Sequence, residues 1–118
     1  MKPFKEAGLI CERDGFLAKA NVDHDIMYHS PAGFEWGYGG SGPSELALNV
    51  MNQVLPIGCD EQEPVTMGGE KVSWAAHRLY QRFKWEFIEE IPPEGGHIPL
   101  GDICAWVEEQ LGVSGETS

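Results

Sequence analysis

The chain has 118 residues, 42% of them hydrophobic, with 19 acidic side chains against 8 basic ones and a net charge of −11. This length suits one domain with its own hydrophobic core, and the hydrophobic fraction excludes an intrinsically disordered chain. The acidic excess argues against a general binder of nucleic acids or anionic membranes, because contact with phosphate groups requires a basic face.

The first predicted element is an N-terminal β-hairpin. Strands at 8–12 and 16–20 flank a turn at 13–15, where an Asp–Gly pair favours a tight hairpin because glycine accepts a positive φ. The following residues, 21–33, are rich in turn formers and are predicted to be irregular, with a short extended piece near 26–28.

A helix is predicted to follow the glycine-rich segment at 33–43. Pro43 suits its first helical position, where a missing N–H costs nothing, with Gly42 or Ser41 as the cap. Apolar side chains then recur at three- and four-residue spacing, at Ala47, Val50, Met51, Val54 and Leu55. Pro56 ends this helix, and its wide apolar face predicts a central position.

In the second half of the chain, the sequence pattern predicts two further helices with one short strand between them. An acidic loop at 56–70 precedes a long helix near 70–91, which two prolines end. A strand at 97–98 then leads into a last helix near 101–111, whose apolar residues follow a helical period.

Together these elements predict an α+β fold in a single domain that spans residues 1–118. An N-terminal β-hairpin or small antiparallel sheet packs with about three helices. The core covers about 8–111, and 112–118 form a flexible tail.

The three cysteines, Cys11, Cys59 and Cys104, show no pairwise spacing and are predicted to be reduced thiols, with Cys104 in the core. Residues 1–6 lack the apolar stretch of a signal peptide, and no apolar run approaches the ~20 residues of a membrane span. These features predict a cytoplasmic protein without a membrane partner.

One stretch carries a family resemblance. Residues 29–48, which include the run GFEWGYGGSGP, resemble the signature of a family of small bacterial, archaeal and phage proteins of unknown function. The similarity continues at 79–84 and, more weakly, around Ile103 and Trp106, so it covers most of 9–111. The resemblance implies no activity. It implies that the glycine-rich loop and the later helix form one unit, and it is compatible with an origin in a phage or mobile element.

The glycine-rich loop is the candidate ligand site. It matches Gly-x-Gly-x-x-Gly and leads into a helix N-terminus, where backbone N–H groups favour an anion such as a phosphate. The candidate anion-binding residues are Gly37, Gly39, Gly40, Ser41 and Gly42, with Arg78 and Arg82 as counter-charges. Lys84 is a further possible counter-charge, and one is needed because Glu35 opposes an anion. The alternative is a structural turn in which Phe34, Trp36 and Tyr38 alternate into the core.

No arrangement typical of catalysis is recognisable, so an enzyme is not favoured. Ser41 lacks the residue pattern of a nucleophile elbow. The run Asp23-His24-Asp25 with His29 matches no established metal motif and is better explained as a polar turn. We predict no catalytic residue, no metal site and no cofactor.

The charge is concentrated in blocks. Residues 20–70 and 85–118 each carry eight acids and no base, whereas 71–84 carry four bases and no acid. Dense carboxylates on a small fold can engage the basic groove of a larger protein in place of nucleic acid. The candidate partner-binding residues are Asp60, Glu61, Glu63, Glu89 and Glu90.

Two functional hypotheses result. The first is a non-enzymatic acidic binding protein that contacts a basic protein surface, as a phage or mobile-element inhibitor of a host defence system would. The second is a protein that binds a nucleotide or phosphate ligand at the Gly37–Gly42 loop. Direct contact with nucleic acid is not expected, and the oligomeric state stays open.

The basic segment also carries aromatic residues. Trp74, Tyr80 and Trp85 lie among or beside its cations. Such a stripe could stack on nucleic-acid bases, accept an acidic partner surface or form a solvated face. The net charge argues against the nucleic-acid interpretation and leaves the other two open.

Overall fold

In the computed structural model, the predicted N-terminal hairpin is present. β1 (Leu9–Asp14) pairs antiparallel with β2 (Leu17–Ala20), and Asp14 lies opposite Leu17 across a turn of Gly15 and Phe16. Gly15 adopts a φ of 62°, the left-handed conformation that favours glycine. The turn is therefore shorter than the predicted 13–15 and lies later in the chain.

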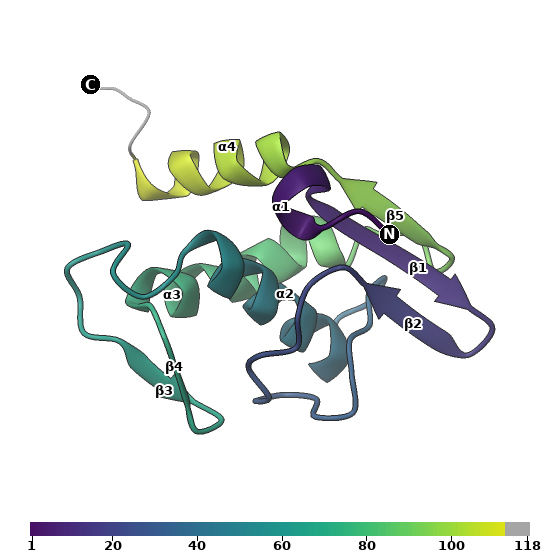
Figure 1. The fold of residues 1–118 in the computed structure, drawn as a ribbon, viewed down its shortest axis with the longest axis horizontal. Coiled ribbons are helices and arrows are strands. Elements are labelled where there is room, and N and C mark those ends of the chain that lie inside the picture. The colour runs from purple at the N-terminus through teal and green to yellow at the C-terminus, as the bar shows by residue number, and fades with distance from the viewer. Residues whose placement is uncertain (113–118) are drawn as a thin grey trace.

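A third strand from the far end of the chain completes this sheet. β5 (Gly95–Ile98) pairs antiparallel with β1, which gives the strand order β2-β1-β5 (Figure 1). The sequence predicted a strand only at 97–98, because glycine has a low strand propensity. Gly95 lies so close to β1 that a Cβ there would be 2.2 Å from the carbonyl oxygen of Cys11, so glycine lets the two strands meet.

Three main helices accompany the sheet, as predicted. α2 (Ser41–Val54) occupies the centre, α3 (Trp74–Phe83) packs on it and α4 (Leu100–Leu111) lies across one side, while α1 (Phe4–Ala7) is a single turn (Figure 1). Every residue at 42–51 is buried, so the predicted central position of this helix is confirmed. The α+β fold class is confirmed as well.

The structure differs from the predicted helix near 70–91 at both of its ends. Its predicted start is wrong, because β4 (Glu70–Val72) pairs with β3 (Val65–Met67) in a separate two-stranded sheet. Ser73 then caps α3 by accepting the N–H of Ala76. After α3 the chain continues as the π-helical turn η1 (Lys84–Ile88). The acidic loop is thus shorter than predicted and runs into a hairpin.

Side-chain burial corrects two further expectations. Cys104 is exposed rather than in the core, because it faces away from the buried side of α4. Trp36 is buried and Phe34 packs partly buried against the core, but Tyr38 remains 51% exposed. The predicted alternation of aromatic side chains into the core is therefore correct for the first two and wrong for the third.

The structure describes residues 1–112. Gly112 ends α4 in the left-handed conformation, and the remainder of the predicted flexible tail, 113–118, lies outside the described residues. No helix in the described part combines the length and the apolar character needed to cross a lipid bilayer.

Candidate functional site

A buried carboxylate in α2 holds a surface loop in place. Glu45 is fully buried, and its carboxylate accepts the backbone N–H groups of Tyr28 at 3.1 Å and His29 at 2.7 Å. The same carboxylate lies 2.7 Å from Nε2 of His24. One acidic side chain therefore binds the loop at both ends of residues 24–29.

A second side chain of α2 fixes the middle of this loop. Asn49 lies one helical turn after Glu45 and is 1% exposed. Its side chain accepts the N–H of Ile26 and donates to the carbonyl of the same residue, each at 2.9 Å. This pair of bonds satisfies both backbone groups of Ile26, whose own side chain is buried. We call residues 23–28, with their anchors in α2, the anchored loop.

Two other elements close around the anchored loop. The ring of His29, the next residue, lies with Nε2 2.8 Å from the hydroxyl of Tyr80 in α3. The turn of the β3–β4 hairpin packs on the loop backbone, since a Cβ on Gly68 would lie only 2.1 Å from the carbonyl oxygen of Met27. The loop is therefore held by three elements that are distant in sequence.

The electrostatics of these anchors favour a charged Glu45. Burial acts to raise the pKa of Glu45, but hydrogen bonds from His24 and from backbone N–H groups of residues 28–30 together outweigh it, so the pKa lies below 4.5. Burial lowers the pKa of His29 and raises the pKa of Tyr80. The network therefore consists of a carboxylate anion beside a neutral Tyr80 hydroxyl near neutral pH.

This network is suited to fixing backbone rather than to chemistry. Glu45 is surrounded by its own chain and presents no oxygen to solvent. Within residues 1–112 no three His, Cys, Asp or Glu side chains converge as metal ligands would. The groups that reach solvent are instead Asp23, Asp25, Met27 and Tyr28, the last two with 52% of their surface exposed. The arrangement thus presents a rigid, acidic and partly apolar contact surface.

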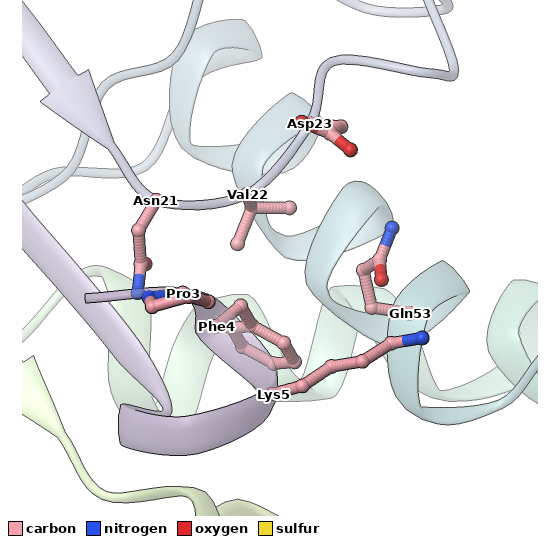
Figure 2. A pocket seen from close by; sticks show the side chains of 7 residues that line it. All are labelled: Pro3, Phe4, Lys5, Asn21, Val22, Asp23 and Gln53. Carbon is pink, nitrogen blue, oxygen red and sulfur yellow. The ribbon is translucent and has the colours of Figure 1, made fainter. Parts of the chain in front are cut away.

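A hollow of about 290 Å³ extends this surface toward α1 (Figure 2). Phe4 and Val22 form its apolar floor, and Lys5, Asp23 and Gln53 bring polar groups to its edge. Neither Lys5 nor Asp23 has an ion-pair partner among the described residues. The hollow therefore gives the anchored loop a concave neighbour with free charges.

The glycine-rich loop lies between carboxylates. A Cβ on Gly39 would be 2.9 Å from a carboxylate oxygen of Glu89, and one on Gly42 would be 2.7 Å from Cβ of Glu35. The base that offsets Glu35 is Arg13, whose guanidinium binds both carboxylate oxygens, at 2.7 and 3.1 Å. This hydrogen-bonded pair lowers the pKa of Glu35. The positive end of α2 is therefore already accompanied by acidic side chains.

The predicted counter-charges of an anion site have other neighbours. The guanidinium of Arg78 lies 5.5 Å from the ring centre of Trp74. Arg82 contacts Glu86 at 3.3 Å and Gln110 at 3.2 Å. In the described residues these contacts do not join either arginine to the loop of Gly37, Gly39, Gly40, Ser41 and Gly42. Anion binding at this loop stays a prediction, with Lys84 placed 3.9 Å from Glu89, whose carboxylate lies against Gly39.

The five predicted partner-binding acids are divided between different surroundings. Asp60 is half-buried and accepts the N–H of Ala75 at 2.9 Å, so it helps to cap α3. Glu61 and Glu63 are exposed in the same segment, Glu90 is exposed after η1, and Glu89 pairs with Lys84. Their role as partner contacts stays a prediction.

The anchors of this site were not predicted from the sequence. The interacting pairs are far apart in sequence, since Glu45 lies 21 positions after His24 and Glu35 lies 22 positions after Arg13. One local signal exists for Glu45, because it is the only ionisable residue in the largely apolar α2. A lone acid on a helix that is buried on most faces indicates a buried, hydrogen-bonded carboxylate.

Comparison with known protein families finds a match to part of the chain. Residues 6–62 are similar to a protein family of unknown function (DUF6166). This segment contains the hairpin, the anchored loop, the glycine-rich loop and α2, but not α3 or α4, so it is shorter than the expected resemblance over 9–111. No curated protein and no solved structure matches the chain significantly.

Proposed function

We propose that this protein is a non-enzymatic binding protein that docks onto a basic surface of another protein through the anchored loop. The observation that carries this proposal is the burial of the Glu45 carboxylate against His24 and Tyr28 of that loop and the adjoining His29. Removing a carboxylate from water costs several kcal/mol unless its hydrogen bonds compensate. The hydrogen bonds of Glu45 therefore stabilise one backbone conformation of the loop.

Rigidity of the loop favours binding. A loop that is already fixed loses little conformational entropy when a partner engages it, which improves affinity without new contacts. Its exposed Met27 and Tyr28 belong to the residue types enriched in protein interfaces. Asp23 and Asp25 on the same loop supply the charge that a basic partner would meet.

The distribution of charge supports a basic partner. Residues 1–112 contain eighteen acidic residues, of which Glu35, Glu45, Glu86 and Glu89 form ion pairs. The other fourteen have no ion-pair partner there, so their charges can attract a basic surface and raise the rate of encounter. Asp60, which caps α3, contributes charge but not a free side chain, whereas Glu61, Glu63 and Glu90 are available for contact.

A finer version of the proposal concerns the biological setting. Carboxylates on a rigid fold compete with nucleic acid for the same basic groove, and the signature at 29–48 resembles proteins found in phages and mobile elements. We therefore propose an inhibitor that acts in the cytoplasm on a nucleic-acid-binding protein of a host defence system.

The test compares two variants with the same change in net charge. Tagged wild-type protein, the Asp23→Asn/Asp25→Asn variant and the Glu108→Gln/Glu109→Gln variant are used to capture partners, which mass spectrometry identifies and whose affinity is then measured. Glu108 and Glu109 are exposed on α4, on the other side of α2 from the loop (Figure 1). We expect a basic partner whose affinity falls about tenfold or more with the loop variant only.

Other outcomes would count against this function. Equal losses of partner affinity in both variants would mean that net charge alone causes the effect. A partner without a basic surface would contradict the proposal. Thermal stabilisation by nucleotides would favour the anion site instead, because ligand at 100 times its Kd adds about 2.7 kcal/mol. The proposal of a defence inhibitor further requires that the wild-type protein inhibit nucleic-acid cleavage by the captured partner.

A further inference from the structure

The outer face of α3 and η1 carries the most basic and aromatic surface of the described chain. Trp74 and Trp85 are 39% and 60% exposed, although tryptophan is usually well buried. The exposed or half-exposed residues along this face are Trp74, His77, Arg78, Gln81, Arg82 and Trp85, and we call them the Trp74–Trp85 stripe. This stripe lies within a chain whose net charge is −11.

Helix geometry places these residues in one row. Residues at positions i, i+4, i+7 and i+11 share one face of a helix, and eleven residues span about 16 Å. Leu79, Tyr80 and Phe83 lie on the opposite, buried side of α3. Tyr80 also contacts His29, so the stripe and the anchored loop lie on different faces of the molecule.

The cations of the stripe are available for a partner. The guanidinium of Arg78 lies 5.5 Å from the ring centre of Trp74 and has no acidic partner in residues 1–112. Arg82 pairs with Glu86 and donates to Gln110 of α4, but its side chain is 60% exposed. Arginine that lies against an aromatic ring and is still exposed keeps its planar donors for a carboxylate.

The π-helical turn is a second, independent feature of this face. Its wide bond joins the N–H of Glu89 to the carbonyl of Lys84 at 2.9 Å, and such turns occur frequently at functional sites. Phe83, Phe87 and Trp106 form an aromatic cluster directly behind it. Trp85 is excluded from that nearby cluster and remains in solvent.

We propose that the Trp74–Trp85 stripe is a docking surface for an acidic segment of a partner protein that also carries an apolar side chain. Tryptophan and arginine are the residues most enriched among energetic hot spots of protein interfaces. The cations select carboxylates, and the two tryptophans at the ends of the row offer apolar contacts on either side of them. Single-stranded nucleic acid fits less well, because it carries a charge at every nucleotide and the net charge of the chain is −11.

The experiment uses a random dodecapeptide library displayed on phage and the full chain as the target. The test variant Arg78→Gln/Trp85→Ala removes one exposed base and one exposed aromatic ring from the stripe. The control Phe16→Ala/Lys19→Gln also removes one base and one aromatic ring, here from the β1–β2 hairpin, where both side chains are exposed. Circular dichroism checks that both variants fold.

We expect selected peptides to carry Asp or Glu beside an apolar residue. A synthetic peptide of that consensus, followed by fluorescence anisotropy, should bind the stripe variant at least tenfold more weakly than wild type. The control should bind like wild type, and added salt should weaken binding.

Four outcomes would overturn the proposal. They are a basic or uncharged consensus, no enriched peptide, equal losses of peptide affinity in both variants, or a peptide affinity of the stripe variant equal to that of wild type. Labelled oligo-dT that binds wild type and not the stripe variant would assign the face to single-stranded nucleic acid instead. Self-association that only the stripe variant abolishes, seen by size-exclusion chromatography, would assign it to a second copy of the chain.

Discussion

Glu45 shows how one side chain couples the core to the surface. Its carboxylate is buried in α2, yet it binds His24 and Tyr28 of the anchored loop and the adjoining His29. Changing Glu45 to Gln keeps the size but removes the negative charge and replaces one acceptor oxygen with an NH2 donor. The charge-assisted hydrogen bonds to His24 and to the backbone N–H groups of Tyr28 and His29 are therefore weakened. We expect a loss of about 3 kcal/mol in the free energy of unfolding, measured with urea.

The exposed Glu61 provides the matched control for this change. Glu61→Gln makes the same chemical change without a buried partner, so its effect should stay within about 0.5 kcal/mol. Equal stability of the two variants would show that Glu45 does not hold the loop.

The same residue predicts a pH dependence. Because the pKa of Glu45 is lower in the folded state than its usual 4.5, its stabilising contribution is complete above the unfolded-state value and is lost as the pH falls through the folded-state value. His29 acts in the same direction near pH 6.5, since burial lowers its pKa and the unfolded chain binds protons more readily. Stability should therefore decrease on acidification from pH 7.

Urea unfolding between pH 7 and pH 3 measures this trend. The difference in stability between wild type and Glu45→Gln should shrink below about pH 4.5, where the carboxylate of the unfolded chain becomes protonated. A difference that stays constant down to pH 3 would contradict a charged Glu45 as the anchor.

At the scale of elements, the β3–β4 turn acts as a clamp on the anchored loop. Gly68 has a φ of 62°, and a Cβ there would be 2.1 Å from the carbonyl oxygen of Met27. Gly68→Ala must therefore move one of the two backbones, and we expect a loss of about 3 kcal/mol or more. Gly69 is the control, because its φ of 83° is similar but nothing lies within 4 Å of its Cβ position. Gly69→Ala should lower the free energy of unfolding by only about 1 kcal/mol. Thermal or urea unfolding of both variants measures the difference.

The start of α3 separates a structural acid from contact acids. Asp60 and Ser73 bind two N–H groups that the helix leaves free, those of Ala75 and Ala76. Asp60→Ala should lower the free energy of unfolding by about 1 kcal/mol, whereas Glu63→Ala should leave it unchanged. Differential scanning calorimetry would detect the difference. A neutral effect of Asp60→Ala would return this residue to the set of free partner contacts.

These elements also show how far sequence patterns extend. The β1–β2 hairpin, α2 and α4 were predicted because turn residues and apolar spacing are local signals. β4 was predicted as helix, because its strand character comes from pairing with β3 rather than from its own residues. The π turn includes Phe87, which packs on Trp106 of the distant α4, and the Arg13–Glu35 pair likewise joins distant segments. Such tertiary effects have no signal in the spacing of residues.

For the whole molecule, opposite charges are divided between faces. The anchored loop is acidic, the Trp74–Trp85 stripe is basic and aromatic, and the two lie on different sides of the structure. Four ion pairs in the described residues leave the acidic excess almost untouched. A protein of this kind can meet two partners of opposite charge, but the surplus of carboxylates also repels itself in the folded state.

This self-repulsion predicts that salt stabilises the fold. The screening length falls from about 30 Å at 0.01 M salt to about 8 Å at 0.15 M, so added NaCl weakens repulsion across the molecule. We expect about 1 kcal/mol of stabilisation, a Tm increase of roughly 4 °C, over this range. A variant with Gln at positions 61, 63, 108 and 109 loses four exposed acids and should start from a higher Tm at low salt, with a smaller response to NaCl. A Tm that falls with salt would mean that attractive pairs such as Arg13–Glu35 outweigh the repulsion.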